Sequence, residues 1–261
     1  MLYSKKINHP ISDQWVVFIH GAGGSSAIWH KQIKPFSNLY NILLVDLRGH
    51  GKSKLKSEKS EYSFEVISKD VIEVMHSHNI SQAHLVGVSM GSIIIKQIYT
   101  TNPELVKSMI FAGAVTKLNI KSRALLKLGR MLNRFLPYMT LYKLFARIMM
   151  PKKNHDQSRK MFIQEAKKLM DKEFKRWFKL TARLTAYLSI LENNNYRIPQ
   201  LYIMGSEDHL FLNPAIELAK RNEFSSVSIV ENCGHVVNIE NSDKFNTLSI
   251  EFIERIKANK S

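Results

Sequence analysis

A serine that could act as a nucleophile stands in the pentapeptide Gly87-Val88-Ser89-Met90-Gly91, which fits the pattern G-x-S-x-G. The apolar run 85–88 precedes it as an expected strand, and the stretch 91–101 follows it as an expected helix. A tight strand-to-helix turn exposes the serine hydroxyl above the sheet, and the amide end of the helix favours a developing oxyanion. We therefore interpret Ser89 as a nucleophile. The alternative is a surface serine in an ordinary glycine-containing turn.

A serine hydroxyl is a weak nucleophile at neutral pH and needs a base. The chain has ten histidines, and His235 is the best placed because it lies in a separate loop just after the last expected strand. His209 is the rival for this role, whereas His20 opens a glycine-rich loop and is interpreted as structural.

A base of this kind needs an acid that fixes its tautomer and stabilises the imidazolium. Asp208 directly follows the expected strand 201–204 and is the predicted acid, with the adjacent Glu207 as the alternative. The chain order Ser89, Asp208, His235 then corresponds to nucleophile, acid and base.

Small residues follow the apolar run 15–19, in the segment His20-Gly21-Ala22-Gly23-Gly24. Such a turn lets backbone N–H groups point at a ligand, so we predict an oxyanion hole formed by the amides of Ala22 and Met90. A phosphate-binding loop is disfavoured, because the segment lacks the lysine of G-x-x-x-x-G-K-[ST] and the spacing of G-x-G-x-x-G.

The elements that must position these residues alternate along the chain. Apolar runs rich in β-branched residues predict buried strands, and the stretches between them predict helices. The expected strands are 15–19, 42–45, 85–88, 109–111, 201–204 and 227–230, and the expected helices are 64–78, 91–101, 214–221 and 243–257. This alternation predicts an α/β fold with a mostly parallel sheet, helices on both faces and a ligand site at the carboxyl ends of the strands.

Composition limits the class of protein. With 261 residues, 44% of them hydrophobic and 23% charged, the chain fits a globular protein with one sizeable core. No apolar run reaches the ~18 residues of a membrane span, no apolar leader opens the sequence, and one cysteine is present. We therefore expect a cytoplasmic protein.

The net charge of +16 is concentrated in one segment. Residues 116–195 hold 19 of the 38 basic side chains but 5 of the 22 acidic ones. We therefore divide the chain into a core of residues 1–115 and 196–261 and an inserted helical cap of residues 116–195. Within the cap, Leu125, Leu128, Leu132 and Phe135 share one helix face, which we expect to cover the pocket.

Together, these motifs resemble α/β-hydrolase-fold serine hydrolases of the esterase and lipase type. The matching segments are His20–Gly24, Asp46-Leu47-Arg48-Gly49-His50-Gly51-Lys52-Ser53, Gly87–Gly91, Gly205-Ser206-Glu207-Asp208 and Gly234-His235. The resemblance implies an eight-stranded, mostly parallel sheet, a helical lid after the sixth strand, and a structural rather than catalytic role for residues 46–53. Relatives with an aspartate nucleophile, the epoxide hydrolases and dehalogenases, are disfavoured by Ser89.

The sequence thus predicts a serine carboxylic-ester hydrolase that acts through an acyl-enzyme on apolar acyl esters, with no metal or organic cofactor. Alternatives on the same fold are a thioesterase or carrier-bound acyl ester hydrolase, a carbon–carbon hydrolase, a lyase of menaquinone synthesis and a non-catalytic ligand- or membrane-binding protein. The basic cap is interpreted as a solvated face, as a surface for acyl carrier protein or acyl-CoA, or as a peripheral contact with an anionic membrane. Nucleic acid is not an expected partner.

Overall fold

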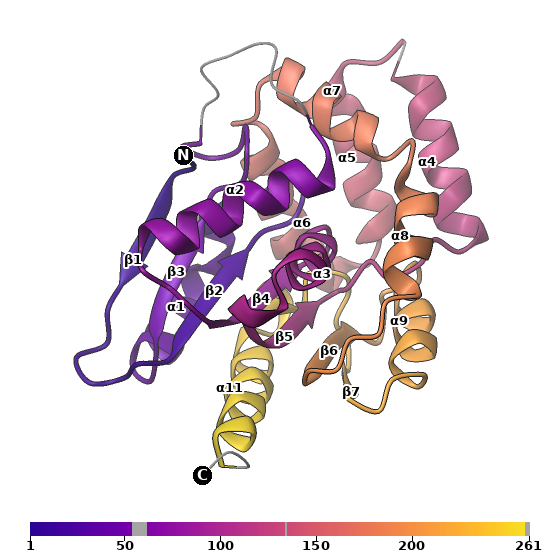
Figure 1. Cartoon of the computed structure of the whole chain (residues 1–261). Coiled ribbons are helices and arrows are strands. Elements are labelled where there is room, and N and C mark those ends of the chain that lie inside the picture. The colour runs from indigo at the N-terminus through magenta and orange to yellow at the C-terminus, as the bar shows by residue number, and fades with distance from the viewer. Residues whose placement is uncertain (54–61, 134, 259–261) are drawn as a thin grey trace.

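The structure, a computed structural model, describes residues 1–53, 62–133 and 135–258 (Figure 1). Its strands are β1 (Ser4–Ile7), β2 (Trp15–Ile19), β3 (Asn41–Val45), β4 (Ala83–Val88), β5 (Val106–Ala112), β6 (Gln200–Gly205) and β7 (Ser225–Val230). They form one sheet in the order β1-β3-β2-β4-β5-β6-β7. β1 pairs antiparallel with β3, and the other neighbouring strands pair in parallel. The predicted α/β fold with a mostly parallel sheet is confirmed.

The helices that flank this sheet are α1 (His30–Ser37), α2 (Phe64–Ser77), α3 (Gly91–Thr101), α9 (Leu212–Ala219), α10 (Val237–Glu240) and α11 (Ser242–Ala258). Between β5 and β6 lie α4 (Ile120–Leu132), α5 (Tyr138–Met149), α6 (Asp156–Ala166), α7 (Asp171–Leu180) and α8 (Leu184–Glu192). Side-chain caps mark where two of these helices begin. Ser63 accepts a hydrogen bond from the amide of Val66 at the start of α2, and Asn119 does the same for Ser122 at the start of α4.

Two expectations about the sheet are wrong. Seven strands, rather than eight, lie in the described part of the chain, and the inserted helices follow the fifth strand rather than the sixth. Only seven residues link β1 to β2, and the His9 ring folds this link back by accepting the amides of Ile11 and Ser12. In the described sheet, β1 is the one antiparallel strand, and it lies at the edge beside β3. β1 itself escaped the sequence analysis because Ser-Lys-Lys-Ile is too polar to resemble a buried strand.

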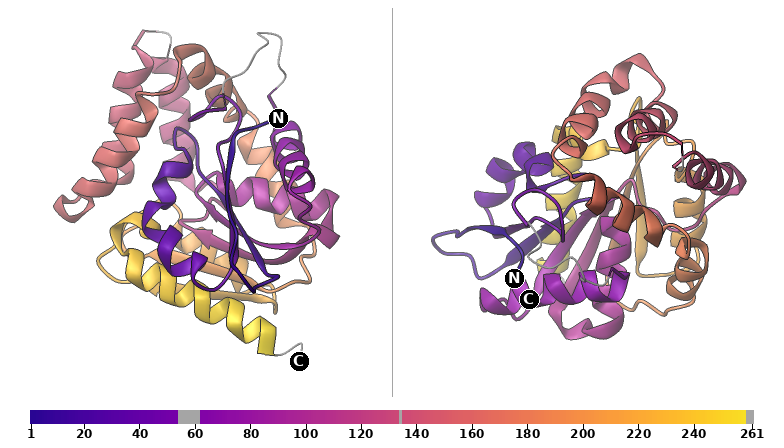
Figure 2. Two further views of the ribbon diagram at one scale, coloured as in Figure 1. Left: turned by 90° about the vertical axis from the view of Figure 1, so that its left-hand side faces the viewer. Right: turned by 90° about the horizontal axis from the view of Figure 1, so that it is seen from above.

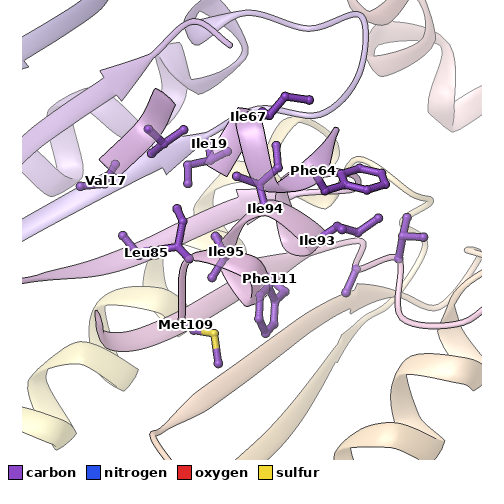
Figure 3. Packing of buried hydrophobic residues seen from close by; sticks show 14 of the residues in the cluster. Val17, Ile19, Phe64, Ile67, Leu85, Ile93, Ile94, Ile95, Met109 and Phe111 are labelled. Carbon is purple, nitrogen blue, oxygen red and sulfur yellow. The ribbon is translucent and has the colours of Figure 1, made fainter. Parts of the chain in front are cut away.

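Alternate residues of each strand enter two separate cores. Val17 and Ile19 of β2 belong to a cluster that also holds residues of α2, α3, α8 and α9, and Figure 3 shows part of it around Ile94 and Phe111. Phe18 of β2 faces the opposite side, where it packs with α1, α10 and α11. The left view of Figure 2 shows α1 and α11 on one side of the sheet and α2 on the other. The sheet is thus covered by helices on both faces, and the loops at its ends are anchored by this packing.

The inserted helices cover one end of the sheet. Helices α4, α5 and α7 lie above it in Figure 1, whereas α8 returns to pack against α3. The expected inward face of α4 is only partly right. Leu125 lines the space beneath the cap, but Leu128 is 41% and Phe135 79% exposed. Pro137 restarts the chain as α5 in a new direction, so the periodicity of α4 does not continue to Phe135 in a single helix.

A bilayer-crossing helix was not expected from the sequence. Within residues 1–53, 62–133 and 135–258, none of the helices is both long enough and apolar enough to traverse a membrane.

Candidate active site

Ser89 occupies a sharp turn between β4 and α3. Its φ is +53°, in the left-handed region that residues other than glycine and asparagine seldom adopt, so the backbone is strained here. The amide of Ser89 donates to the carbonyl of Ala112 on β5 at 3.0 Å, which holds the turn against the sheet. Gly91 permits this geometry because a Cβ there would overlap the carbonyl oxygen of Ile19. The two glycines of the pentapeptide therefore serve close packing, and the serine is raised above the strand ends.

Ser89, His235 and Asp208, from three separate loops, come together at the carboxyl ends of the strands. His235 Nε2 lies 2.9 Å from Ser89 Oγ, and His235 Nδ1 lies 2.7 Å from Asp208 Oδ2. Both His235 and Asp208 are 1% exposed. A carboxylate only accepts hydrogen bonds, so Nδ1 carries the ring proton and Nε2 is left to accept one from the serine hydroxyl. The arrangement can take a proton from Ser89.

The second oxygen of the Asp208 carboxylate is also held. Asp208 Oδ1 accepts the amides of Phe211 at 3.1 Å and Leu210 at 3.3 Å, just before α9. The Phe211 ring packs against the His235 ring with centroids 5.1 Å apart. His209, the rival base, is exposed and does not take part in this network. The carboxylate is therefore fixed by backbone donors on one side and by the histidine on the other.

Glu207, the alternative acid, points away from His235. Its carboxylate contacts Lys152 Nζ at 2.7 Å, Asn154 Nδ2 at 2.9 Å and His155 Nε2 at 2.7 Å. These hydrogen bonds, that of Asn154 first and then that of Lys152, lower the pKa of Glu207 to about 2. Glu207 is therefore not placed to act as the acid, and its carboxylate instead joins the loop that carries Asp208 to the residues just before α6.

The predicted oxyanion residues line the same space as Ser89. The amides of Ala22 and Met90 donate no hydrogen bond to any described part of the protein, and Met90 immediately precedes α3. Backbone donors without a partner at a helix N-terminus suit a negatively charged oxygen. Tyr142 of α5 fixes the loop from the cap by donating its hydroxyl to the carbonyl of Ala22 at 3.1 Å.

Two buried histidines support this loop from below. His50 Nε2 accepts the amide of Gly23 at 2.8 Å, and its Nδ1 donates to the carbonyl of Arg48. Burial, followed by the neighbouring His20, lowers the pKa of His50 to about 3, so the ring stays neutral and can accept. His20 Nε2 accepts the amide of Leu47 at 2.9 Å, and burial lowers its pKa as well. The sequence analysis gave residues 46–53 a structural role but did not identify the hydrogen bond from the Gly23 amide to His50. The available signal was the histidine between Gly49 and Gly51.

A cavity of about 190 Å³ lies between Ser89 and His235 on one side and the cap on the other. Its walls are mainly apolar, and the cap contributes five aromatic side chains: Tyr142, Phe145, Phe162, Phe174 and Phe178. Glu165 is the carboxylate in this wall, and it is held by the hydroxyl of Ser25 at 2.6 Å and by Lys168. Ser89 and His235 open into this space, which accepts an apolar group.

A metal site has no support among the described residues. No group of three or more histidine, cysteine, aspartate or glutamate side chains there is arranged to hold an ion.

Comparisons with known proteins agree with this architecture. A family model described as "alpha/beta hydrolase fold" matches residues 14–144. The (E)-2-((N-methylformamido)methylene)succinate hydrolase of Acinetobacter baylyi is 25% identical over 92% of this chain and 90% of its own. The pimeloyl-[acyl-carrier protein] methyl ester esterase of Aeromonas hydrophila is 34% identical, over 36% of this chain and 35% of its own. The solved thermophilic esterase of Thermogutta terrifontis superposes with a TM-score of 0.80 at 15% identity, covering 98% of this chain and 93% of its own.

Proposed function

This chain belongs to the α/β-hydrolase-fold family, and from that premise we propose that it is a serine hydrolase that cleaves carboxylic esters with an apolar acyl group. The observation that carries the proposal is the relay from Ser89 through His235 to Asp208, at 2.9 and 2.7 Å, beneath an apolar cavity. The named activities of the relatives, a hydrolase and esterases, agree with this reaction class.

The geometry is consistent with an acyl-enzyme mechanism. Ser89 Oγ attacks the ester carbonyl while His235 Nε2 takes its proton. The resulting oxyanion accepts the amides of Ala22 and Met90, and its collapse expels the alcohol, which His235 protonates. Water then attacks the acyl-enzyme with His235 again as base, and the carboxylic acid leaves. Throughout, Asp208 holds the imidazole in one tautomer and stabilises its charged form.

The cavity argues for an apolar acyl group. Its aromatic walls give such a group dispersion contacts and remove its surface from water, at about 25 cal/mol for each Å² buried. Glu165, the one carboxylate among the described residues of the wall, is already engaged by Ser25 and Lys168 and therefore does not call for a cationic substrate. A volume of about 190 Å³ favours a short or medium acyl chain unless the cap moves.

The test is the initial rate of hydrolysis of p-nitrophenyl esters from acetate to palmitate. We expect turnover that disappears in Ser89→Ala and persists in Ser189→Ala, a matched change at an exposed serine of α8. The best chain length then measures the depth of the cavity. Equal rates in the wild type and Ser89→Ala at every length would refute the proposal and direct attention to carbon–carbon substrates, a lyase reaction or a binding role.

A second candidate is hydrolysis of an acyl ester or thioester presented by an acidic carrier. The observation behind it is the concentration of 19 basic side chains in residues 116–195, most of which are exposed where the structure describes them. Charge attraction raises association rates and is screened by salt. We expect kcat/KM for an acyl carrier protein ester to fall steeply with ionic strength while that for a neutral p-nitrophenyl ester does not. Equal salt dependence would remove this candidate, and co-sedimentation with anionic vesicles tests membrane docking in its place.

A further inference from the structure

A second hollow lies at the opposite end of the sheet from Ser89. It has a volume of about 480 Å³ and is bounded by the amino ends of β6 and β7, by the loops that follow α8 and α9, and by the middle of α3. Its lining is mostly polar and includes the amides of Asn193, Asn195 and Asn222, whereas the cavity above Ser89 is apolar. The two spaces have no lining residue in common, so the hollow is not an extension of the proposed active site.

A lysine forms the inner wall of this hollow. Lys96 of α3 is 4% exposed, and none of the described residues gives its ammonium a hydrogen bond or an ion pair. Glu192 is the nearby carboxylate, but it pairs with Arg221 at 2.9 Å. An ammonium taken out of water without an anionic partner is costly, and proteins seldom keep one without a use for it.

Aromatic rings surround the same ammonium. The Nζ of Lys96 lies 5.3 Å from the ring centre of Tyr196, 5.6 Å from that of Tyr202 and 5.7 Å from that of Phe111. Cation–π contacts of this kind hold the ammonium in place but supply no counter-charge. The aromatic rings therefore hold the Lys96 ammonium in place, but among the described residues it has no hydrogen-bond acceptor.

A buried amide completes the site. Gln200, at the start of β6, is 1% exposed, and its Oε1 accepts the hydroxyl of Tyr202. Its Nε2 has no hydrogen-bond partner, although an orphaned buried donor costs about 1–3 kcal/mol. Gln200 and Tyr202 are two residues apart on one strand, so both side chains face the same side of the sheet as Lys96. Two donors, one charged and one neutral, thus line one hollow without acceptors.

We propose that this hollow is a binding site for a small organic monocarboxylate, whose carboxylate accepts hydrogen bonds from Lys96 Nζ and Gln200 Nε2. The asparagine amides at the rim offer hydrogen bonds to further polar groups of the ligand. The carboxylates of Glu192 and Glu223 also line the hollow and disfavour a multiply charged anion such as phosphate. Nothing in this proposal depends on the chemistry at Ser89.

Titration calorimetry with N-acetylglycine tests the proposal, with the neutral N-acetylglycinamide and inorganic phosphate as comparison probes. We expect one N-acetylglycine per chain to bind the wild type, at least tenfold weaker binding to Lys96→Met, and unchanged binding to Lys220→Met, a matched change at an exposed lysine after α9. Gln200→Leu should also weaken binding, and it keeps the ammonium in place. N-acetylglycinamide and phosphate should not bind.

Three results would overturn the proposal. One is the absence of N-acetylglycine binding to the wild type. Another is equal binding to the wild type and Lys96→Met, which would place the ligand elsewhere, for example beside Ser89. The third is Lys96-dependent binding of phosphate in preference to the carboxylate.

Discussion

Replacing Lys96 by methionine should stabilise the folded protein, and by more at pH 7 than at pH 10. Burial lowers the pKa of Lys96 from 10.5 to about 7, although the nearby Glu192 carboxylate acts in the opposite direction. At about 1.36 kcal/mol for each factor of ten in acidity, the shift corresponds to about 5 kcal/mol of discrimination against the charged form. Methionine keeps the length of the side chain and removes the charge.

The pH dependence follows from proton binding. Between pH 7 and 10.5 the unfolded chain holds a proton on this lysine that the folded chain has released, so the stability of the wild type rises with pH in this window. We expect Lys96→Met to gain about 4 kcal/mol at pH 7 and about 1 kcal/mol at pH 10. With an unfolding entropy of about 2.1 cal/mol/K per residue, the gain at pH 7 raises Tm by about 7 °C.

The tyrosines beside Lys96 do not change charge between pH 7 and pH 10, so they do not alter the expected stability difference between the wild type and Lys96→Met. Burial raises the pKa of Tyr196 to about 12 and that of Tyr202 further, so both phenols stay neutral up to pH 10.

The assay is calorimetric unfolding of the wild type, Lys96→Met and Lys220→Met at pH 7 and pH 10. The exposed Lys220→Met control should stay within about 0.5 kcal/mol of the wild type at both pH values. A Tm difference between Lys96→Met and the wild type that is the same at both pH values would refute the reasoning, because it would mean that Lys96 is not desolvated in the folded state.

Substitutions at three further positions test the proposed active site through ester hydrolysis. Asp208→Asn removes the acceptor that fixes the tautomer of His235 and should lower kcat by about 10³–10⁴-fold with unchanged circular dichroism. Glu207→Gln should leave kcat within about tenfold of the wild type, since its carboxylate contacts the start of α6; a loss as large as that of Asp208→Asn would reverse the assignment of the acid. His50→Ala removes the acceptor of the Gly23 amide and should lower kcat by about 10–100-fold, with partial recovery in His50→Gln, whose carbonyl can accept; equal activity of all three proteins would exclude a positioning role.

The sequence alone was sufficient to predict those elements that are determined by residues close together in the chain. Apolar runs located six of the seven strands, and the order of glycine, serine and glycine located the turn between β4 and α3, because a β-branched run and a tight turn constrain their own residues. It did not locate β1, whose polar residues become a strand only by pairing with β3.

Tertiary structure decided the choices that depend on distant contacts. Asp208 and Glu207 are adjacent and chemically alike, and only packing turns Asp208 toward His235 and Glu207 toward the cap. Helical periodicity placed Leu125 and Leu128 on the same face of α4. Of the two, Leu125 lines the cavity and Leu128 is 41% exposed, because the neighbouring helices fix how α4 is rotated.

Lys96 is the clearest case of a residue whose environment depends on distant contacts. In the sequence it is a polar residue in an apolar helix, with no motif around it. Its aromatic neighbours come from β5, from β6 and from the loop before β6, more than ten residues away along the chain. Residue types and short-range spacing thus determined the fold class and the candidate catalytic groups. The partners, burial and charge state of each group were decided by long-range packing, which no local pattern encodes.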